Sequence, residues 1–421
     1  MQIIHNNRIE FRNARHYEQL EKSIDVEIFE DFESLSGMQQ NWDRFMEEMN
    51  AEIFLSYDWC KIWWKYYGKD RVLKIFLFKE NDQIVGILPL FLEIVGQWPM
   101  NISVIKIVGT DFNPITVSIP LKKDLLNELL KSFINELNHV CSWDIIYLGA
   151  ICGRYEASDQ LEQALNEILS SAYYIQRKTT DIQTYFQIAN NWEEQIATLS
   201  QKQRNKTRRE FKEIQKRGLS LACVHATSAT FTPMFTDFVQ MHKTQWQKRG
   251  MPGHFNEWPY SYDFHKEFAY VQLTRGRLRL LQIWLGDVVI GYEYLFRYGN
   301  TYQWYLGART GLENEQHLHF YRLSFREKIE SALSENVRCI DAGRGEYEYK
   351  IDMGGKLLPV QSIIIYSRSP IAFFVVNLFR RLVWLTDILY SKLWRRRIAP
   401  WLGIKTGSFW QWWTKTHMFS H

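Results

Sequence analysis

Residues 337–355 read VRCIDAGRGEYEYKIDMGG and combine a strand end, a turn and a dense group of reactive side chains. The stretch begins as a short apolar strand that ends on an acid, Asp341, and it then turns on Gly343 and Gly345. Glycines at a strand end let backbone amides approach a ligand closely, and the acids, phenols and amine beside them are groups that move protons. A polar turn with solvated charges is the alternative interpretation.

The composition is that of a globular protein with 421 residues and 46% hydrophobic content, enough for two ordinary domains and an appendage. The net charge of +4 is too small to indicate nucleic-acid binding, so DNA is not an expected partner. The five cysteines form no C-x-x-C pair, which favours free thiols in a reducing cytosol. The first twenty residues lack the apolar segment of a signal peptide, and no run approaches the ~18 apolar residues of a membrane span.

Two parts of the chain repeat the same order of predicted elements. Residues 73–93 read as two strands joined at Asn81-Asp82, and a strand, a helix over 123–138 and a closing strand over 143–150 follow. Residues 278–308 read as three strands, followed by a helix over 316–334 and the strand that ends at Gly343. The pattern D-x-h-h-G, where h is apolar, occurs at 82–86 and again at 287–291. The sequence therefore predicts an internal duplication of an α+β unit.

A basic helix lies between the repeats, over residues 200–218. Arg204, Arg208, Lys212 and Lys216 follow one another at i+4 spacing, so they form one stripe, and Gly218 is expected to end the helix. Such a stripe is suited to binding phosphates. A solvated charged face is the alternative.

The next predicted helix, over residues 238–250, places His242, Trp246 and Arg249 about one turn apart. An acid–base group, a stacking surface and an anion-binding group on one side of a helix predict substrate binding. A histidine that is simply packed or solvated is the alternative.

The tail from Ser369 onward has an amphipathic pattern: Phe374, Leu378, Leu382, Leu385, Leu389 and Leu393 share one helical face, opposite basic residues and followed by a Trp-rich end. This pattern is typical of a helix that lies in the interface of an anionic membrane. In that case we expect the tail to be dispensable for the fold. A helix docked on the protein's own surface is the alternative.

Motifs for nucleotide hydrolysis, serine hydrolysis and zinc proteolysis are absent from the sequence. His317 and His319 have no second cluster of ligands nearby in the sequence, so we expect no metal.

Four stretches carry a family resemblance. They are the basic helix with Arg204, Arg208 and Arg209, the segment HKTQWQKRG at 242–250, the strand YQWYLGA at 302–308, and DAGRGEYEYK at 341–350. In this order they resemble the tandem acetyltransferase-fold family labelled CelD-like or BioF2-like, which is related to the FemAB peptidoglycan aminoacyltransferases. The resemblance covers residues 26–367.

The resemblance implies an α+β fold with two tandem GNAT-like (acyl-CoA N-acyltransferase) domains and a C-terminal amphipathic helical tail. The expected divisions are an arm at 1–24, domains at 25–180 and 181–368, and the tail at 369–421, with the active site in the second domain. The backbone amides of Tyr305, Leu306 and Gly307 would then face the donor, with a helix N-terminus beside them for its pyrophosphate. The segment after Gly307, ARTGLENEQHLHF, lacks the usual acetyltransferase loop. This departure leaves room for another thioester or an aminoacyl donor.

The expected function is transfer of an acyl group from acyl-CoA or another acyl thioester to an amine or hydroxyl. The acceptor would be a cell-envelope polysaccharide or its lipid-linked precursor, and the enzyme would be peripheral on the cytoplasmic side of a bacterial inner membrane. Asp341 or Glu346 is predicted as the base or the acceptor-binding acid, Tyr349 as the proton donor to the leaving group, and Lys350 or Arg344 as the group that binds phosphate or oxyanion charge.

Two other functions stay open at this point. One is a non-catalytic component of a polysaccharide biosynthesis or export complex that keeps the fold. The other is a FemAB-like transferase that uses aminoacyl-tRNA, for which the basic helix would follow the RNA backbone.

Overall fold

The computed structural model describes residues 24–96, 101–111, 115–315, 317–368, 370–404 and 410–419. The predicted N-terminal arm lies outside these ranges except for its last residue.

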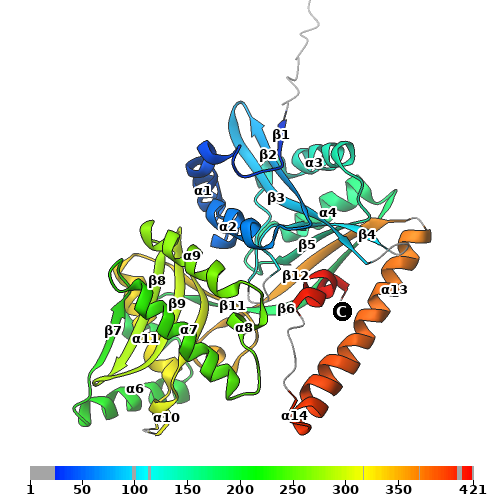
Figure 1. Ribbon diagram of the computed structural model, residues 1–421. Helices are drawn as coiled ribbons and strands as arrows, with labels where there is room; N and C mark the ends of the chain where they lie inside the picture. Colours follow the sequence, from blue (N-terminus) through cyan, green and yellow to red (C-terminus); the bar gives the residue numbers. More distant parts are fainter. Residues whose placement is uncertain are drawn as a thin grey trace, which may run out of the picture.

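A single twelve-stranded sheet runs through the described residues, in the order β1-β2-β3-β4-β5-β12-β6-β11-β10-β9-β8-β7 (Figure 1). The strands are β1 (Asp25–Phe29), β2 (Val72–Glu80), β3 (Gln83–Val95), β4 (Ile102–Ile107), β5 (Ile145–Ile151), β6 (Tyr173–Gln187), β7 (Leu221–His225), β8 (Leu278–Leu285), β9 (Val288–Tyr298), β10 (Thr301–Arg309), β11 (Cys339–Arg344) and β12 (Lys356–Ser367).

Helices cover both halves of this sheet, and a helical tail follows it. The α-helices are α1 (Gln39–Glu48), α2 (Tyr57–Tyr67), α3 (Leu126–Val140), α4 (Ser158–Leu169), α5 (Trp192–Ala197), α6 (Gln201–Lys216), α7 (Phe231–Gln247), α8 (His254–Glu257), α9 (Ser261–Thr274), α10 (Leu312–Glu315), α11 (Phe320–Ser334), α12 (Glu348–Asp352), α13 (Pro370–Thr386), α14 (Ala399–Trp401) and α15 (Trp410–Thr416). Shorter turns are η1 (Ser36–Met38), η2 (Ile53–Leu55), η3 (Lys123–Leu125) and η5 (His417–Phe419), and η4 (Asp387–Ile398) is a π-helical stretch.

The two halves of the sheet repeat one arrangement, as the sequence predicts. In each half an antiparallel hairpin, β2-β3 or β8-β9, turns at the repeated D-x-h-h-G pattern. Asn81 and Asp82 adopt positive φ angles of 50° and 62°, the conformation of a tight hairpin turn. The next two strands, β4 and β5 or β10 and β11, are parallel, and α3 or α11 connects them. The predicted class, α+β with two tandem units and a helical tail, is confirmed.

The halves are joined through their last strands. β12 pairs with β6 along its whole length and with β5 on its other side, so the final strand of the sheet returns to the first half. The predicted boundary between residues 180 and 181 lies inside β6, and it stays a prediction. Aromatic packing joins the halves as well, because Trp59 of α2 meets Phe264 and Phe268 of α9 edge-to-face at 5.0 and 4.9 Å.

The halves differ where their parallel strands diverge. In the first half, Val117 pairs with Ile151 and Leu121 pairs with Gly86, so residues 115–121 fill the interval between β5 and β3. The apolar side chains of this segment are buried. In the second half, β10 and β11 pair only over Thr301–Gln303 and Cys339–Asp341. Beyond that point the two strands enclose a cavity, which makes the second half the place of the candidate site.

The tail packs partly against the body of the protein. Val376, Phe379 and Val383 of α13 are buried together with Met418 and Phe419 at the end of the chain. These contacts do not support the expectation that the tail is dispensable for the fold, because the side chains complete an apolar cluster. Among the described residues no helix is long and apolar enough to cross a membrane.

Candidate active site

A cavity of about 540 Å³ lies between β10, β11 and the helices that cover them. Its lining residues come from α7 and α8 on one side, from β9 and β10, from the start of α11, and from β11 and α12. They are His242, Gln245, Trp246, Arg249, His254, Glu293, Trp304, Tyr305, Leu306, Gly307, Ala308, Arg309, His319, Phe320, Tyr321, Ala342, Arg344, Tyr347, Tyr349 and Lys350.

The wall formed by β10 is irregular. The register against β9 shifts between Trp304 and Leu306, so one residue is left out of the ladder at this bulge. Bulges and diverging strands leave backbone groups without a partner strand, and such groups are available to a ligand. The predicted donor-binding residues Tyr305, Leu306 and Gly307 all line the cavity.

A buried acid on β9, Glu293, faces this wall directly opposite Gly307. Its Oε1 accepts a hydrogen bond from Lys328 Nζ of α11 at 2.5 Å, and both side chains are fully enclosed. Glu293 Oε2 has no hydrogen-bond partner among the described residues. A Cβ atom at Gly307 would lie 2.9 Å from this oxygen, which is closer than an ordinary contact, so the glycine allows the carboxylate to lie against β10.

Glu293 was not among the residues singled out from the sequence. It stands in the otherwise apolar and aromatic run 290–296, IGYEYLF, which forms the middle of β9. Acids are almost never fully buried unless they are paired. A single acid in the middle of a buried strand was therefore the signal that could have identified it.

Aromatic rings form a second wall of the cavity. Tyr349 lies 6.3 Å from Trp304, 5.8 Å from Tyr321 and 5.8 Å from Tyr347, measured between ring centroids. Burial, together with the nearby charge of Glu293, raises the pKa of Tyr349 well above its ordinary value. The phenol therefore keeps its proton at neutral pH and can act as a donor.

Lys350 closes the cavity at its β11 edge. Its Nζ donates hydrogen bonds to the carbonyl oxygens of Ala342 and Arg344, at 2.7 and 3.4 Å. Burial lowers the pKa of Lys350 to about 8. Arg344 donates from Nε to Asp181 at 3.0 Å. In this arrangement Lys350 fixes the strand end on which Arg344 stands.

The side of the cavity formed by α7 brings His242, Trp246 and Arg249 together, at the spacing that the sequence indicates. Trp246 Nε1 donates to His242 Nε2 at 2.9 Å. Burial lowers the pKa of His242 to about 2 and that of His254 to about 4, so both rings are neutral at physiological pH. The two histidines are thus polar wall groups rather than cations.

Positive charge exceeds negative charge in the cavity. Arg249 and Arg309 line it, and the charge of Arg309 acts on the buried acid Glu313, which lies outside the lining. The acid Glu293 is already paired with Lys328. A ligand with a phosphate or carboxylate would supply the missing counter-charge.

Four of the residues predicted from the sequence lie outside the cavity lining. Asp341 precedes Ala342 on β11, and because side chains alternate along a strand it points to the opposite face of the sheet. Glu346 is exposed to solvent. Arg204 donates to the carbonyl oxygens of Ala197 and Leu199, and Arg208 pairs with Glu193 on the surface at 2.9 Å. Phosphate binding by this pair of arginines finds no support in their positions.

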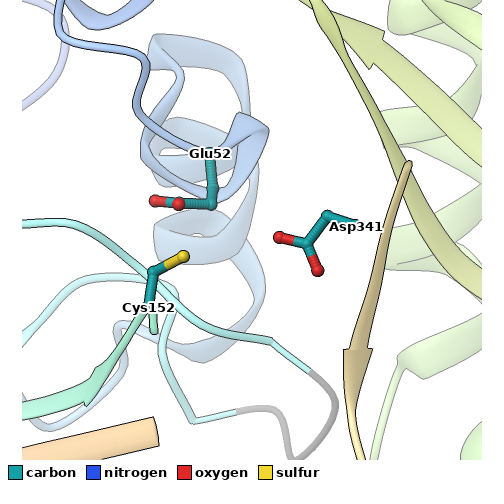
Figure 2. Close-up of side chains that lie close together, drawn as sticks. All are labelled: Glu52, Cys152 and Asp341. Carbon is teal, nitrogen blue, oxygen red and sulfur yellow. The ribbon is translucent and has the colours of Figure 1, made fainter. Parts of the chain in front are cut away.

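Asp341 instead belongs to a buried group between the halves, with Glu52 and Cys152 (Figure 2). The possible ligand atoms of these three side chains all lie within 4.8 Å of one another, as in some metal sites. Arg154 Nη2 lies 3.7 Å from Glu52 Oε1 and 3.5 Å from Asp341 Oδ2, and it already provides a positive charge. Gln183 Nε2 donates a hydrogen bond to Asp341 Oδ2 at 2.7 Å, so protein groups already contact the oxygen that would bind a metal. The group fits an electrostatic contact between the halves better than a metal site.

Comparisons with known proteins agree with this placement. Residues 201–351 match the family model described as an acetyltransferase (GNAT) domain, a range that contains every residue lining the cavity. The structure of FemX aligns with a TM-score of 0.56 and 11% identity, over 77% of this chain and 95% of that chain. No curated protein sequence matches.

Two further structures have TM-scores below 0.5, too low to support an inference. A conserved protein of unknown function from Bacteroides thetaiotaomicron has a TM-score of 0.44 and 10% identity, over 80% of this chain and 96% of that one. A tandem GNAT protein from the clavulanic acid biosynthesis pathway has a TM-score of 0.41 and 10% identity, over 83% and 99%.

Residues 201–351 are therefore similar to a GNAT acetyltransferase domain, and the chain has a GNAT-like fold. This supports a transferase, and it agrees with the FemAB and GNAT part of the resemblance. The narrower CelD-like or BioF2-like assignment stays a prediction.

Proposed function

We propose that the cavity transfers an acyl group from a thioester, acyl-CoA or an acyl carrier, to an amine or hydroxyl of an anionic saccharide acceptor. The observation that carries the proposal is the position of Glu293. Its unpartnered Oε2 is buried at the bulge of β10, where the diverging strands leave room for a donor. A general base lies within hydrogen-bond reach of the proton that it removes, and Glu293 belongs to the cavity lining with this oxygen next to Gly307.

The proposed reaction needs two proton transfers. The acceptor nitrogen or oxygen attacks the thioester carbonyl, and Glu293 Oε2 takes the proton that the acceptor loses. Backbone N–H groups at the β10 bulge stabilise the oxyanion. The carbon–sulfur bond then breaks, and Tyr349 gives its proton to the leaving thiolate. Lys328 compensates the charge of Glu293 in the resting enzyme.

The lining of the cavity supports the choice of acceptor. Rings of Trp304, Tyr321 and Tyr347 offer flat apolar surfaces on which a sugar can stack. Arg249 and Arg309 offer charge for a phosphate or carboxylate. A cell-envelope polysaccharide unit or its lipid-linked precursor combines both features, and an association with polysaccharide-synthesis machinery would deliver it.

The test is the pair of variants Glu293→Gln and Glu346→Gln, assayed for thiol release from acetyl-CoA with amino-sugar phosphates as acceptors. Loss of a general base typically costs about 10²–10⁴-fold in rate, so we expect kcat of Glu293→Gln to fall by that amount. Glu346→Gln, an exposed and isosteric control, should keep wild-type turnover. The reverse result would assign the base to Glu346, one of the two acids that the sequence suggested.

A FemAB-like aminoacyl-tRNA donor is the second candidate. Lys202, Arg209 and Lys212 of α6 are exposed, so part of the basic helix is free to meet RNA backbone. Binding of tRNA that weakens steeply as salt is raised would favour this donor. Absence of turnover with either donor class would favour the non-catalytic role.

A further inference from the structure

The outer face of the tail is the most apolar exposed surface in the described chain. Of the twenty-four large hydrophobic side chains that are exposed, eleven lie between residues 371 and 404. Ile371, Phe374 and Trp401 are 77%, 64% and 82% exposed. Leu382, Leu385, Leu389 and Leu393 continue the same surface along α13 and η4. Contiguous apolar surface of this kind marks an interaction site in soluble proteins.

The tail's own contacts leave this face uncovered. The inner face of α13 is already seated on the body through Val376, Phe379 and Val383. Figure 1 shows α13 continuing away from the sheet toward α14 with its outer side free. Docking on the protein's own surface thus accounts for the inner face alone, and the outer face requires a different occupant.

The charge of residues 371–404 indicates what kind of surface covers the outer face. Residues 371–404 contain six Lys or Arg residues and one acid, Asp387. Lys392 pairs with Asp387 at 3.0 Å, Arg395 pairs with Glu257, and Arg380 donates to Gln176. Arg381 and Arg397 are exposed and form no ion pair within the part of the chain that the structure describes. A second copy of the chain on this face would bring like charges together, which costs free energy. An anionic lipid surface would instead pair with them, and Trp at the border of an apolar face is typical of the membrane interface.

We propose that the exposed face of residues 371–404 docks the protein on the headgroup interface of an anionic bilayer, lying in its plane. This inference does not depend on the proposed reaction. It bears on that reaction, however, because Arg395 of η4 lies 3.3 Å from Glu257 at the end of α8. His254, the first residue of α8, lines the cavity. If the proposed function holds, an acceptor carried by the membrane would meet the cavity from this side.

The experiment is flotation of the full-length protein with vesicles of phosphatidylglycerol and phosphatidylcholine in equal parts, and with vesicles of phosphatidylcholine alone. The variants are Leu389→Glu and Trp401→Ser, both at exposed positions, and Tyr270→Glu on α9 is the matched control at an exposed aromatic position. Melting curves establish that each variant is folded.

We expect the wild type and Tyr270→Glu to float with the anionic vesicles and to be released by high salt. We expect Leu389→Glu and Trp401→Ser to partition onto the vesicles at least ~10-fold more weakly. Each variant loses the transfer free energy of about one apolar side chain that would be buried in the membrane interface. Failure of the wild type to float, or equal flotation of Leu389→Glu, would overturn the proposal. A dimer of the wild type in sedimentation that Leu389→Glu converts to a monomer would overturn it too, in favour of an interface between copies. Loss of flotation does not test turnover, so failure of the membrane-docking proposal can be distinguished from failure of the proposed acyl transfer.

Discussion

Lys350 shows how a residue can line a cavity and still act mainly on the backbone. The sequence pattern suggested that Lys350 binds phosphate or oxyanion charge. The structure instead buries Lys350 and uses its ammonium group to satisfy the carbonyl oxygens of Ala342 and Arg344. Removing a buried donor leaves its acceptors unpaired, at a cost of ~1–3 kcal/mol each in the worst case.

We therefore predict that Lys350→Met lowers the free energy of unfolding and changes its pH dependence. The folded-state pKa of Lys350 is lowered to about 8 from an ordinary value of 10.5, so between these values the unfolded chain binds more protons. Stability from this group thus rises with pH from about 8 to 10.5, by at most ~1.4 kcal/mol per pH unit, and is flat below 8. Urea unfolding of wild type and variant across this range measures the difference. A difference that is independent of pH would contradict the account.

Only some of the residues in the candidate site could be predicted from the sequence. The groups on α7 were found because helix spacing places them on one side, whereas the β10 residues were expected only because of the family resemblance. Asp341 was placed in the site because it ends a strand, but the sequence alone did not show which face of β11 turns toward the cavity. Glu293 was missed because its partner, Lys328, is thirty-five positions away, and only the packing of α11 on β9 brings them together.

At the scale of elements, the end of the tail completes the first half of the sheet. Met418 and Phe419 are buried beside Val104 and Tyr147, and Lys106 Nζ donates to the carbonyl oxygen of Thr414 at 2.8 Å. The leucine pattern of residues 374–393 was visible in the sequence. The return of residues 410–419 to the sheet was not, because such a contact depends on long-range packing.

Truncation after Ile404 should consequently destabilise the protein while leaving α13 in place. Burial of Met418 and Phe419 contributes roughly 1.5–3 kcal/mol each, so we expect the free energy of unfolding to fall by roughly 3–6 kcal/mol. Guanidinium unfolding measures this change, and Lys415→Ala at an exposed neighbouring position is the control. An unchanged midpoint in the truncated chain would show that the segment is not part of the core.

At the scale of the whole molecule, one sheet joins two units that the sequence predicted as tandem domains. The duplication was predictable because hairpins, turns and a connecting helix recur in the same order. The position of β12 between β5 and β6 was not predictable, because pairing between strands nearly two hundred residues apart leaves no local pattern in the sequence.

Because β12 pairs with β5 of the first half, we predict that the halves do not fold separately. A fragment of residues 25–180 would lack β12 and half of β6, and a fragment of residues 181–368 would lack the rest of β6. We expect both fragments to show no cooperative thermal transition, whereas residues 24–419 unfold in one step. A cooperative transition in either fragment alone would restore the predicted boundary as a true domain division.

The central claim is that the opening between β10 and β11 receives the thioester donor. Calorimetric titration with coenzyme A tests it most directly, because the probe does not depend on the identity of the acyl group. A side chain at Gly307 would fill the space beside Glu293 Oε2, so Gly307→Val should abolish binding, while Glu346→Gln should bind like the wild type. Absence of binding to the wild type, or equal affinity in Gly307→Val, would contradict the claim.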